Sequence, residues 1–150
     1  MRDDYTALFV AAQGGHEAVV RLLLAHAAID PNQAEEGGMA PLYIAAEKGH
    51  EAVVRLLLAH AAVDPNQAQQ RGRTPLYMAA MNNQEAVVRL LLAHPAVDAE
   101  RAATGTTPLL EATENRSTAA ALALLDAKAD PNARDNTGVS PLVVARRGDN

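Results

Sequence analysis

The chain has 150 residues, a length that suits one domain. Hydrophobic residues make up 49% of it, but it has no Trp, one Phe and three Tyr, so small aliphatic side chains supply most of the apolar surface. This composition favours closely packed helices over a β-sheet core. The formal charge of −5 argues against a nucleic-acid partner, which would need clustered Lys and Arg.

The cysteine count and the hydropathy pattern exclude further classes of protein. With no cysteine there is neither a disulfide framework nor a thiolate zinc site. No apolar run reaches the roughly 18 residues that span a bilayer. The first five residues are polar and acidic, unlike a signal peptide. We therefore expect a cytoplasmic protein that does not insert into a membrane.

Internal repetition is the dominant signal in the sequence. Residues 15–34 spell GHEAVVRLLLAHAAIDPNQA, and residues 49–68 repeat this with Val63 in place of Ile29. A third copy at 83–102 spells NQEAVVRLLLAHPAVDAERA. A second motif, Pro-Leu or Ala-Leu, recurs at spacings of 34, 34, 33 and 33 residues. We predict one domain over 1–150, with repeats at 1–34, 35–68, 69–101 and 102–134 and a partial fifth at 135–150.

In chain order, each unit predicts a short helix, a turn, a second helix and a loop. Thr74-Pro75 is typical of a first helix, because the hydroxyl caps a free N–H and proline needs none at the first position. Gly49 suits the left-handed turn that follows; Asn83 can replace it there, and Arg116 fits less well. The second helix opens with an acid and shows an apolar stripe, and Asp64-Pro65-Asn66 then ends it.

These units resemble the ankyrin repeat. The resemblance is carried by Thr74–Ala79 (TPLYMA), Ala40–Ala45 (APLYIA) and Gly49–Leu58 (GHEAVVRLLL). It implies an all-α ankyrin-repeat solenoid of stacked antiparallel helix pairs, joined by β-turn or hairpin-like loops. It also implies a protein–protein interaction module rather than an enzyme.

Two departures from the family pattern bear on the loops and on the fourth unit. The family's His after Thr-Pro-Leu organises the loop by hydrogen bonds, so that bonding must be replaced or lost here; the residues at its position are Phe9, Tyr43, Tyr77, Leu110 and Val143. In the fourth unit, residues 116–118 (RST) stand in place of Gly-His-Glu, and the following turn is shortened.

Histidines and turn carboxylates are the residues that a metal site would use. Equivalent histidines of stacked helices, such as His16 and His50, would lie about 8–10 Å apart, too far to share one zinc ion with bonds of about 2 Å. The turn at 30–35 lacks the glycine of an EF-hand loop. We predict no metal site.

The sequence also lacks the elements of a catalytic or cofactor site. No phosphate-binding loop or dinucleotide fingerprint is present. The only serines, Ser117 and Ser140, fall at predicted helix starts. We expect no catalytic residue, no cofactor and no enzymatic activity. The tripeptide at 147–149 (RGD) occurs in integrin ligands, and we interpret it as a chance match.

The resemblance implies that partners bind to a concave strip formed by loop tips and the inner faces of the short helices. Solvent-facing residues that vary between near-identical units are the best candidates, because packing does not dictate them. On the loops these are Tyr5, Glu36, Met39, Gln70, Arg71, Arg73, Thr104, Thr106 and Val139; on the short helices they are Gln13, Glu47, Lys48, Met81, Asn82, Glu114 and Asn115. Tyr, Met and Arg are the types most enriched in interfaces.

Two alternatives to binding an unidentified protein partner stay open. Unsealed ends of the solenoid could stack, which would make the chain a self-associating structural module. Units this similar could also belong to a duplicated or engineered scaffold without a natural partner. The fifth unit has only its first half, as expected of an excerpt from a longer array.

Overall fold

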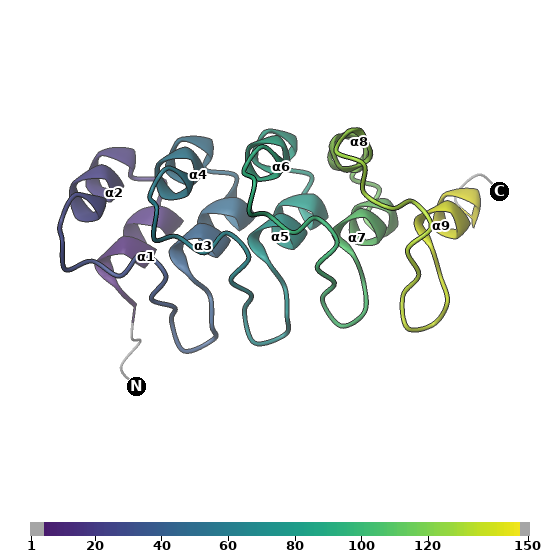
Figure 1. Ribbon diagram of the computed structural model, residues 1–150, viewed down its shortest axis with the longest axis horizontal. Coiled ribbons are helices and arrows are strands. Elements are labelled where there is room, and N and C mark those ends of the chain that lie inside the picture. Colours follow the sequence, from purple (N-terminus) through teal and green to yellow (C-terminus); the bar gives the residue numbers. More distant parts are fainter. Residues whose placement is uncertain (1–4, 148–150) are drawn as a thin grey trace.

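The computed structural model describes residues 5–147, and within this range it contains nine helices and no strand (Figure 1). The tripeptide at 147–149 falls largely outside the described residues. The helices are α1 (Ala7–Gln13), α2 (Glu17–Leu24), α3 (Pro41–Lys48), α4 (Glu51–Leu58), α5 (Pro75–Met81), α6 (Glu85–Leu92), α7 (Pro108–Glu114), α8 (Thr118–Asp126) and α9 (Pro141–Arg147).

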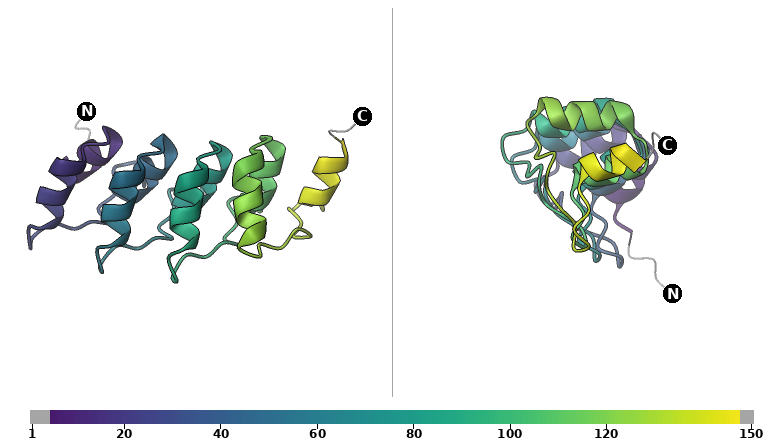
Figure 2. Two further views of the ribbon diagram at one scale, coloured as in Figure 1. Left: turned by 90° about the horizontal axis from the view of Figure 1, so that it is seen from above. Right: turned by 90° about the vertical axis from the view of Figure 1, so that its right-hand side faces the viewer.

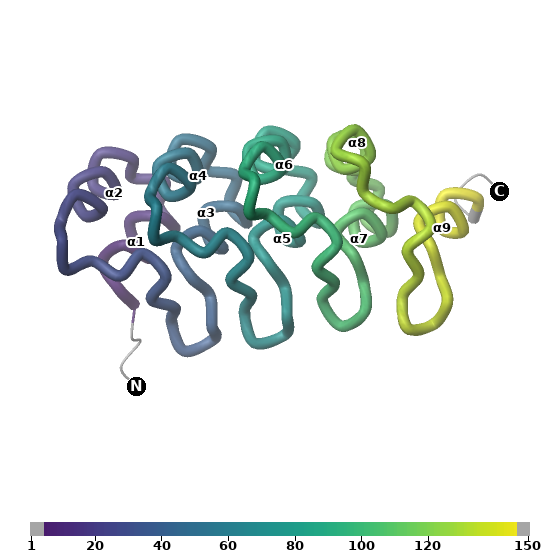
Figure 3. The backbone as a smooth tube through the Cα atoms, in the orientation of Figure 1, coloured from purple at the N-terminus to yellow at the C-terminus, as the bar shows by residue number. Residues whose placement is uncertain are grey.

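The helices form two parallel rows. Helices α1, α3, α5, α7 and α9 make an inner row, and α2, α4, α6 and α8 lie above them as an outer row (Figures 1 and 2). Each helix packs on its counterpart in the next unit and, from α1 to α8, on its partner within the unit. The loops between units project away from the outer row as a series of fingers (Figure 3). This confirms the predicted all-α solenoid of helix pairs.

The inner helices begin where the sequence predicts. The Thr6 hydroxyl accepts a hydrogen bond from the Phe9 amide at 3.0 Å, and the Thr74 hydroxyl accepts one from the Tyr77 amide at 3.2 Å. Thr107 caps α7 in the same way. Ala40 has no hydroxyl, so α3 starts without this bond and with Pro41 at its first position.

The turn between paired helices requires a left-handed residue in every complete unit. Gly15 and Gly49 have φ values of 69° and 75° there. Asn83 and Arg116 adopt the same conformation, with φ values of 53° and 56°. The prediction that Asn83 replaces the glycine is confirmed. Arg116 fits only by adopting a conformation in which its Cβ is crowded.

The core runs lengthwise between the two rows. Val20, Val54 and Val88 occupy the same place in α2, α4 and α6, and all three are fully buried. The neighbouring position shows the effect of the array's end: Val53 is 1% exposed, whereas its equivalent Val19 in α2 is 46% exposed. Each outer helix therefore covers one face of the helix before it and offers its other face to the next.

A ladder of asparagines also links consecutive units. The Asn32 amide donates to the Ala62 carbonyl at 2.6 Å, and its oxygen accepts from the Asp64 amide at 2.8 Å. Asn66 makes the same two bonds one unit later. Where the sequence has Glu100 instead, its carboxylate accepts from the Asp130 amide at 2.8 Å.

Candidate functional site

The loops that carry the candidate residues are closed by hydrogen bonds. Glu35 donates its amide to the Met39 carbonyl at 3.1 Å, and its carboxylate accepts from the Met39 amide at 2.9 Å. Asp135 and Val139 form the same pair of bonds at 2.9 and 2.8 Å. A side chain at the start of each of these two loops thus helps to close the loop.

The loop before α7 is tighter than the others. Ala103 and Thr106 exchange two backbone hydrogen bonds of 2.9 Å, which form an isolated antiparallel bridge. Two residues lie between the bonded pair here, whereas three lie between Glu35 and Met39. This shorter loop accounts for the spacing of 33 residues between Pro75 and Pro108.

A second apolar cluster lies where the loops meet the inner helices. Tyr43, Tyr77, Met78 and Ala103 are buried in it, and Met39 and Met81 pack against it partly buried; we call these six residues the tyrosine cluster. It is separate from the long core between the two helix rows. The loops are therefore held against the inner helices by apolar contact as well as by hydrogen bonds.

Polar groups extend the tyrosine cluster from one unit to the next. The Tyr77 hydroxyl donates to the Glu111 carboxylate of the following unit. The Arg73 guanidinium lies 5.7 Å from the centroid of the Tyr77 ring, within the range of a cation–π contact. Burial, and then the bond to Glu111, raise the pKa of Tyr77. Burial is also the main reason that the pKa of Tyr43 is raised. Both hydroxyls are therefore neutral at physiological pH, and that of Tyr77 donates a hydrogen bond.

Carboxylates gather near the end of α7. Burial raises the pKa of Glu114, and the negative charges of Glu111 and Asp135 add to this effect. The pKa of Asp135 is lowered, first because the Thr137 hydroxyl donates to its carboxylate. The face formed by loops and inner helices thus presents cations around Arg71 and Arg73 and anions around α7.

The structure divides the sixteen predicted site residues by exposure. Ten are exposed: Tyr5, Gln13, Glu36, Lys48, Gln70, Arg71, Asn82, Thr104, Glu114 and Asn115. Six are partly buried: Met39, Glu47, Arg73, Met81, Thr106 and Val139.

Several candidates also make contacts within the chain. The Gln70 side chain donates to the Glu36 carbonyl at 2.6 Å, and Asn115 donates to the Glu111 carboxylate at 2.9 Å. Tyr5 stacks on Phe9 with ring centroids 5.2 Å apart. Internal packing therefore constrains these positions more than we expected from the sequence.

Sequence reasoning missed Tyr43, Tyr77 and Glu111 as residues that hold this surface in place from beneath. The two tyrosines were treated only as departures from the family's histidine. Their spacing of 34 residues, with Tyr at the same position of consecutive units, was the available signal. The bond from Tyr77 to Glu111 had no such signal, because it joins different positions of neighbouring units.

Histidines serve the architecture locally. His50 Nε2 lies 3.0 Å from the Gln13 carbonyl of the preceding unit, and His60 Nδ1 accepts from the Ala62 amide at 3.3 Å. Among residues 5–147, no three His, Asp or Glu side chains gather as a metal ion would require. No helix in that range is long and apolar enough to cross a membrane.

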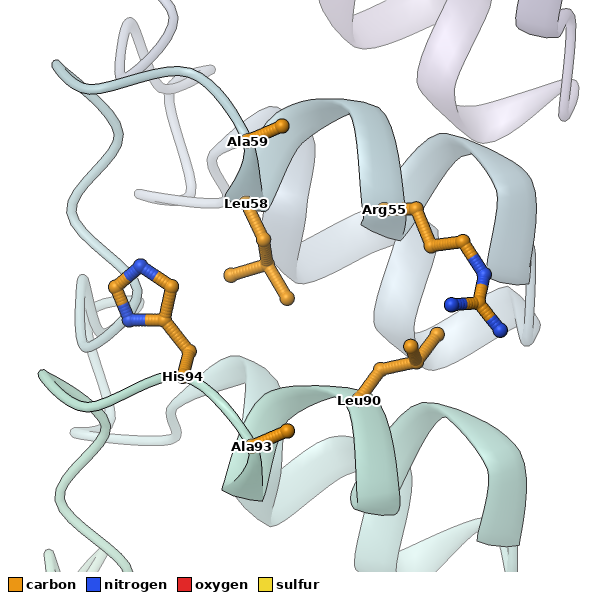
Figure 4. Close-up of a pocket in the computed structure, with 6 residues that line it drawn as sticks. All are labelled: Arg55, Leu58, Ala59, Leu90, Ala93 and His94. Carbon is orange, nitrogen blue, oxygen red and sulfur yellow. The ribbon is translucent and has the colours of Figure 1, made fainter.

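An open depression of about 340 Å³ lies on the outer row between α4 and α6 (Figure 4). Arg55 and Leu58 of α4 and the following Ala59 line one side of it, and Leu90 of α6 and the following Ala93 and His94 line the other. None of the sixteen candidates lies in it. We interpret it as a consequence of stacking equal helices rather than as a specific site.

Two rows of short helices, with left-handed turns between pairs and loops projecting to one side, define a helical repeat array. A family model described as ankyrin repeats (3 copies) matches residues 1–69 and 61–135. The chain belongs to the ankyrin repeat family. Ankyrin repeats are generally protein–protein interaction modules and not enzymes. A search of curated proteins found no match.

Proposed function

We propose that this chain binds a protein partner through the face formed by its loop tips and the exposed ends of its inner helices, without catalysis. The supporting observation is where the units differ. Helices α2, α4 and α6 have the same sequence, EAVVRLLL. The ends of the inner helices differ, with Gln13, Glu47-Lys48, Met81-Asn82 and Glu114-Asn115 at corresponding places. A surface whose residues differ from unit to unit can recognise one particular partner, whereas identical units would present the same groups repeatedly.

The face is also organised before a partner arrives. Each loop is closed by its own hydrogen bonds, and the tyrosine cluster packs loops against helices. A preformed surface loses little conformational entropy on binding. Its exposed cations, Lys48 and Arg71, lie in adjacent units and can engage acidic groups of the partner.

The test is a double charge reversal on this face. Lys48→Glu with Arg71→Glu changes two exposed side chains whose loss leaves the core intact. Partners captured by the wild-type chain are identified, purified and titrated against both proteins. We expect the double variant to bind at least about tenfold more weakly, which corresponds to about 1.4 kcal/mol.

The matched control reverses the same number of charges on the outer row. Arg21 and Arg55 are exposed on α2 and α4, away from the loops. Arg21→Glu with Arg55→Glu should leave the affinity unchanged, provided circular dichroism shows equal helicity for all three proteins. Equal affinity of the wild type and the Lys48→Glu/Arg71→Glu variant would refute this placement of the binding face.

Self-association through the ends is a second candidate function, because both ends expose apolar side chains. Leu22 of α2 is 74% exposed, and Leu122 of α8 is 55% exposed. However, α9 occupies the inner-row place next to α7. A second copy continuing the array from α8 would need that same place for its own α1. We therefore propose partner binding, rather than in-register stacking, as the main function.

A further inference from the structure

Arg73 differs from the other cations that the structure describes. It is partly buried, whereas every other lysine and arginine side chain in the described part of the chain is exposed. Its backbone is fixed at the base of the loop, because its carbonyl accepts a hydrogen bond of 3.0 Å from the Gln69 amide and the next residue, Thr74, caps α5. The loop therefore holds this cation at the point where it joins the inner helices.

The Arg73 guanidinium lies against an aromatic ring that is itself held in place. It is 5.7 Å from the centroid of the Tyr77 ring. Tyr77 is 3% exposed, and its hydroxyl donates to Glu111 of the following unit. Burial raises the pKa of both Tyr43 and Tyr77, and the positive charge of Arg73 opposes this rise at both hydroxyls. Arg73 thus lies close to the tyrosines of two consecutive units.

The charge of Arg73 has no carboxylate partner within residues 5–147, where the ion pairs involve other cations. The Glu111 carboxylate accepts instead from the Tyr77 hydroxyl and from the Asn115 amide. A guanidinium is weakly hydrated, stacks on aromatic rings and binds a carboxylate through two parallel hydrogen bonds. Arg73 is therefore suited to bind a carboxylate of another molecule.

The other charges near Arg73 also favour an incoming acid. Glu47 lies 3.4 Å from the Lys48 ammonium, and Glu111 is bonded to Tyr77, so these two carboxylates are engaged within the chain. Arg71 is exposed in the same loop and, like Arg73, forms no ion pair in the described range. An acidic group that approaches this loop therefore meets two cations that are not yet neutralised.

The residues equivalent to Arg73 determine what a partner meets beside it. Two positions before the first proline of the inner helix, the other units have Met39, Thr106 and Val139, and all four side chains at this position are partly buried. Met39 belongs to the preceding unit and packs against the tyrosine cluster. A segment that crosses from that unit to the next thus meets an adaptable apolar side chain and then a cation.

We propose that Arg73 binds an aspartate or glutamate in an extended segment of the partner protein, and that Met39 contacts an apolar residue of the same segment. This inference rests on the proposed function, because it places the segment on the same face. Packed helices lie about 8–10 Å apart. In the polyproline II conformation, side chains recur every three residues over about 9 Å. The segment should therefore carry its acid and its apolar residue three positions apart.

The test begins with a displayed library of random short peptides, selected in parallel on the immobilised full chain and on Arg73→Met. Methionine is the residue that the preceding unit has at this position, so we expect the variant to fold, and circular dichroism checks its helicity. Peptides enriched on the wild type should contain Asp or Glu with an apolar residue three positions away. On Arg73→Met, the acid should fall to its frequency in the unselected library.

The most enriched peptide is then titrated against the purified proteins by fluorescence anisotropy. Arg73→Met should weaken binding at least about tenfold. Arg73→Lys should fall between the two, because it keeps the charge and loses the planar group. A peptide with the amide in place of its acid should lose as much affinity as Arg73→Met causes, and both changes together should cost little more than either alone. Such non-additivity would identify Arg73 and the acid as a contacting pair.

Arg55→Met on the outer row is the matched control and should alter neither the selected sequences nor the affinity. Acids equally frequent on the wild type and on Arg73→Met, additive losses in the titration, or no enrichment on the wild type would overturn the inference. If Lys48→Glu with Arg71→Glu still weakened partner binding in that case, the proposed face would stand and only the role of Arg73 would fail.

Discussion

Left-handed residues mark where this chain departs from an ideal repeat. Among residues 5–147, Asn83, Thr104, Arg116 and Lys128 have positive φ values between 51° and 66°. Asn tolerates this conformation best, since its short side chain can bond locally. Arg116 has a Cβ in the same turn where Gly15 and Gly49 have none. The strain is therefore concentrated in the fourth unit.

Replacing Arg116 by glycine should stabilise the protein. The left-handed conformation costs a residue with a Cβ about 1–2 kcal/mol, and glycine returns part of this through its greater freedom when unfolded. We expect Arg116→Gly to raise the free energy of unfolding by about 0.5–1 kcal/mol in urea denaturation. Asn83→Gly should change it less. A destabilised Arg116→Gly variant would show that the Arg116 side chain makes a stabilising contact.

The carboxylate of Asp135 makes loop stability depend on pH. It accepts from the Thr137 amide, the Thr137 hydroxyl and the Val139 amide at 2.7–2.8 Å, and these donors lower its pKa. A carboxylate whose pKa is lower in the folded state contributes stability above its unfolded pKa of about 3.9. That contribution is lost as the pH falls through the folded pKa.

Asp135→Ala should therefore lower the melting temperature at pH 7, and the difference from wild type should shrink as the pH falls below the unfolded pKa of about 3.9 and through the lower folded pKa. Thermal melts at the two pH values, followed by circular dichroism, measure this. If the variant and the wild type differed equally in melting temperature at both pH values, the loss would come from a changed loop conformation and not from the hydrogen bonds of a charged carboxylate.

At the scale of elements, the asparagine ladder acts between units that helix packing already joins. Asn66 bonds the next unit twice, at 2.6 and 2.8 Å, whereas Asn132 sits in an equivalent turn without such bonds in the described range. The two positions form a matched pair, because the local Asp-Pro-Asn sequence is the same.

Asn66→Ala should lower the free energy of unfolding by about 1–2 kcal/mol, since each hydrogen bond contributes about 0.5–1.5 kcal/mol. Asn132→Ala should be nearly neutral in the same chemical denaturation. Equal losses at both positions would show that the asparagines stabilise their own turns and not the junctions between units.

Most of the fold followed from local signals in the sequence. The helix starts at Thr74 and Thr107, the turn at Gly49 and the helix pairs all depend on residues close together along the chain. The exception at Tyr77 is informative, because its partner Glu111 lies 34 residues away and at another position of the repeat.

For the candidate surface, the variation between units identified which positions to consider, but it did not show which of their side chains are partly buried. Met39 and Met81 are partly buried within the tyrosine cluster, through contacts that only the stacked units create.

At the scale of the whole molecule, the stability of a unit depends on its neighbours. Helices α3 to α6 have a unit on each side, whereas α9 packs on α7 and has no outer helix above it among the described residues. Local unfolding should therefore start in the units at the two ends of the array.

Amide hydrogen exchange should be fastest in α9, slower in α1 and α2, and slowest in α4 and α5. Mass spectrometry of deuterated peptides resolves these segments, which differ enough in sequence around the inner helices to be assigned. Exchange in α9 as slow as in α5 would show that the array opens all at once.

The equality of α2, α4 and α6 has a mechanical consequence. Because the same side chains join α2 to α4 and α4 to α6, the two junctions resist a pulling force almost equally. Under tension applied along the array, these units should unfold at similar forces. Each unit that unfolds would release a segment of 34 residues, which extends to about 110–120 Å.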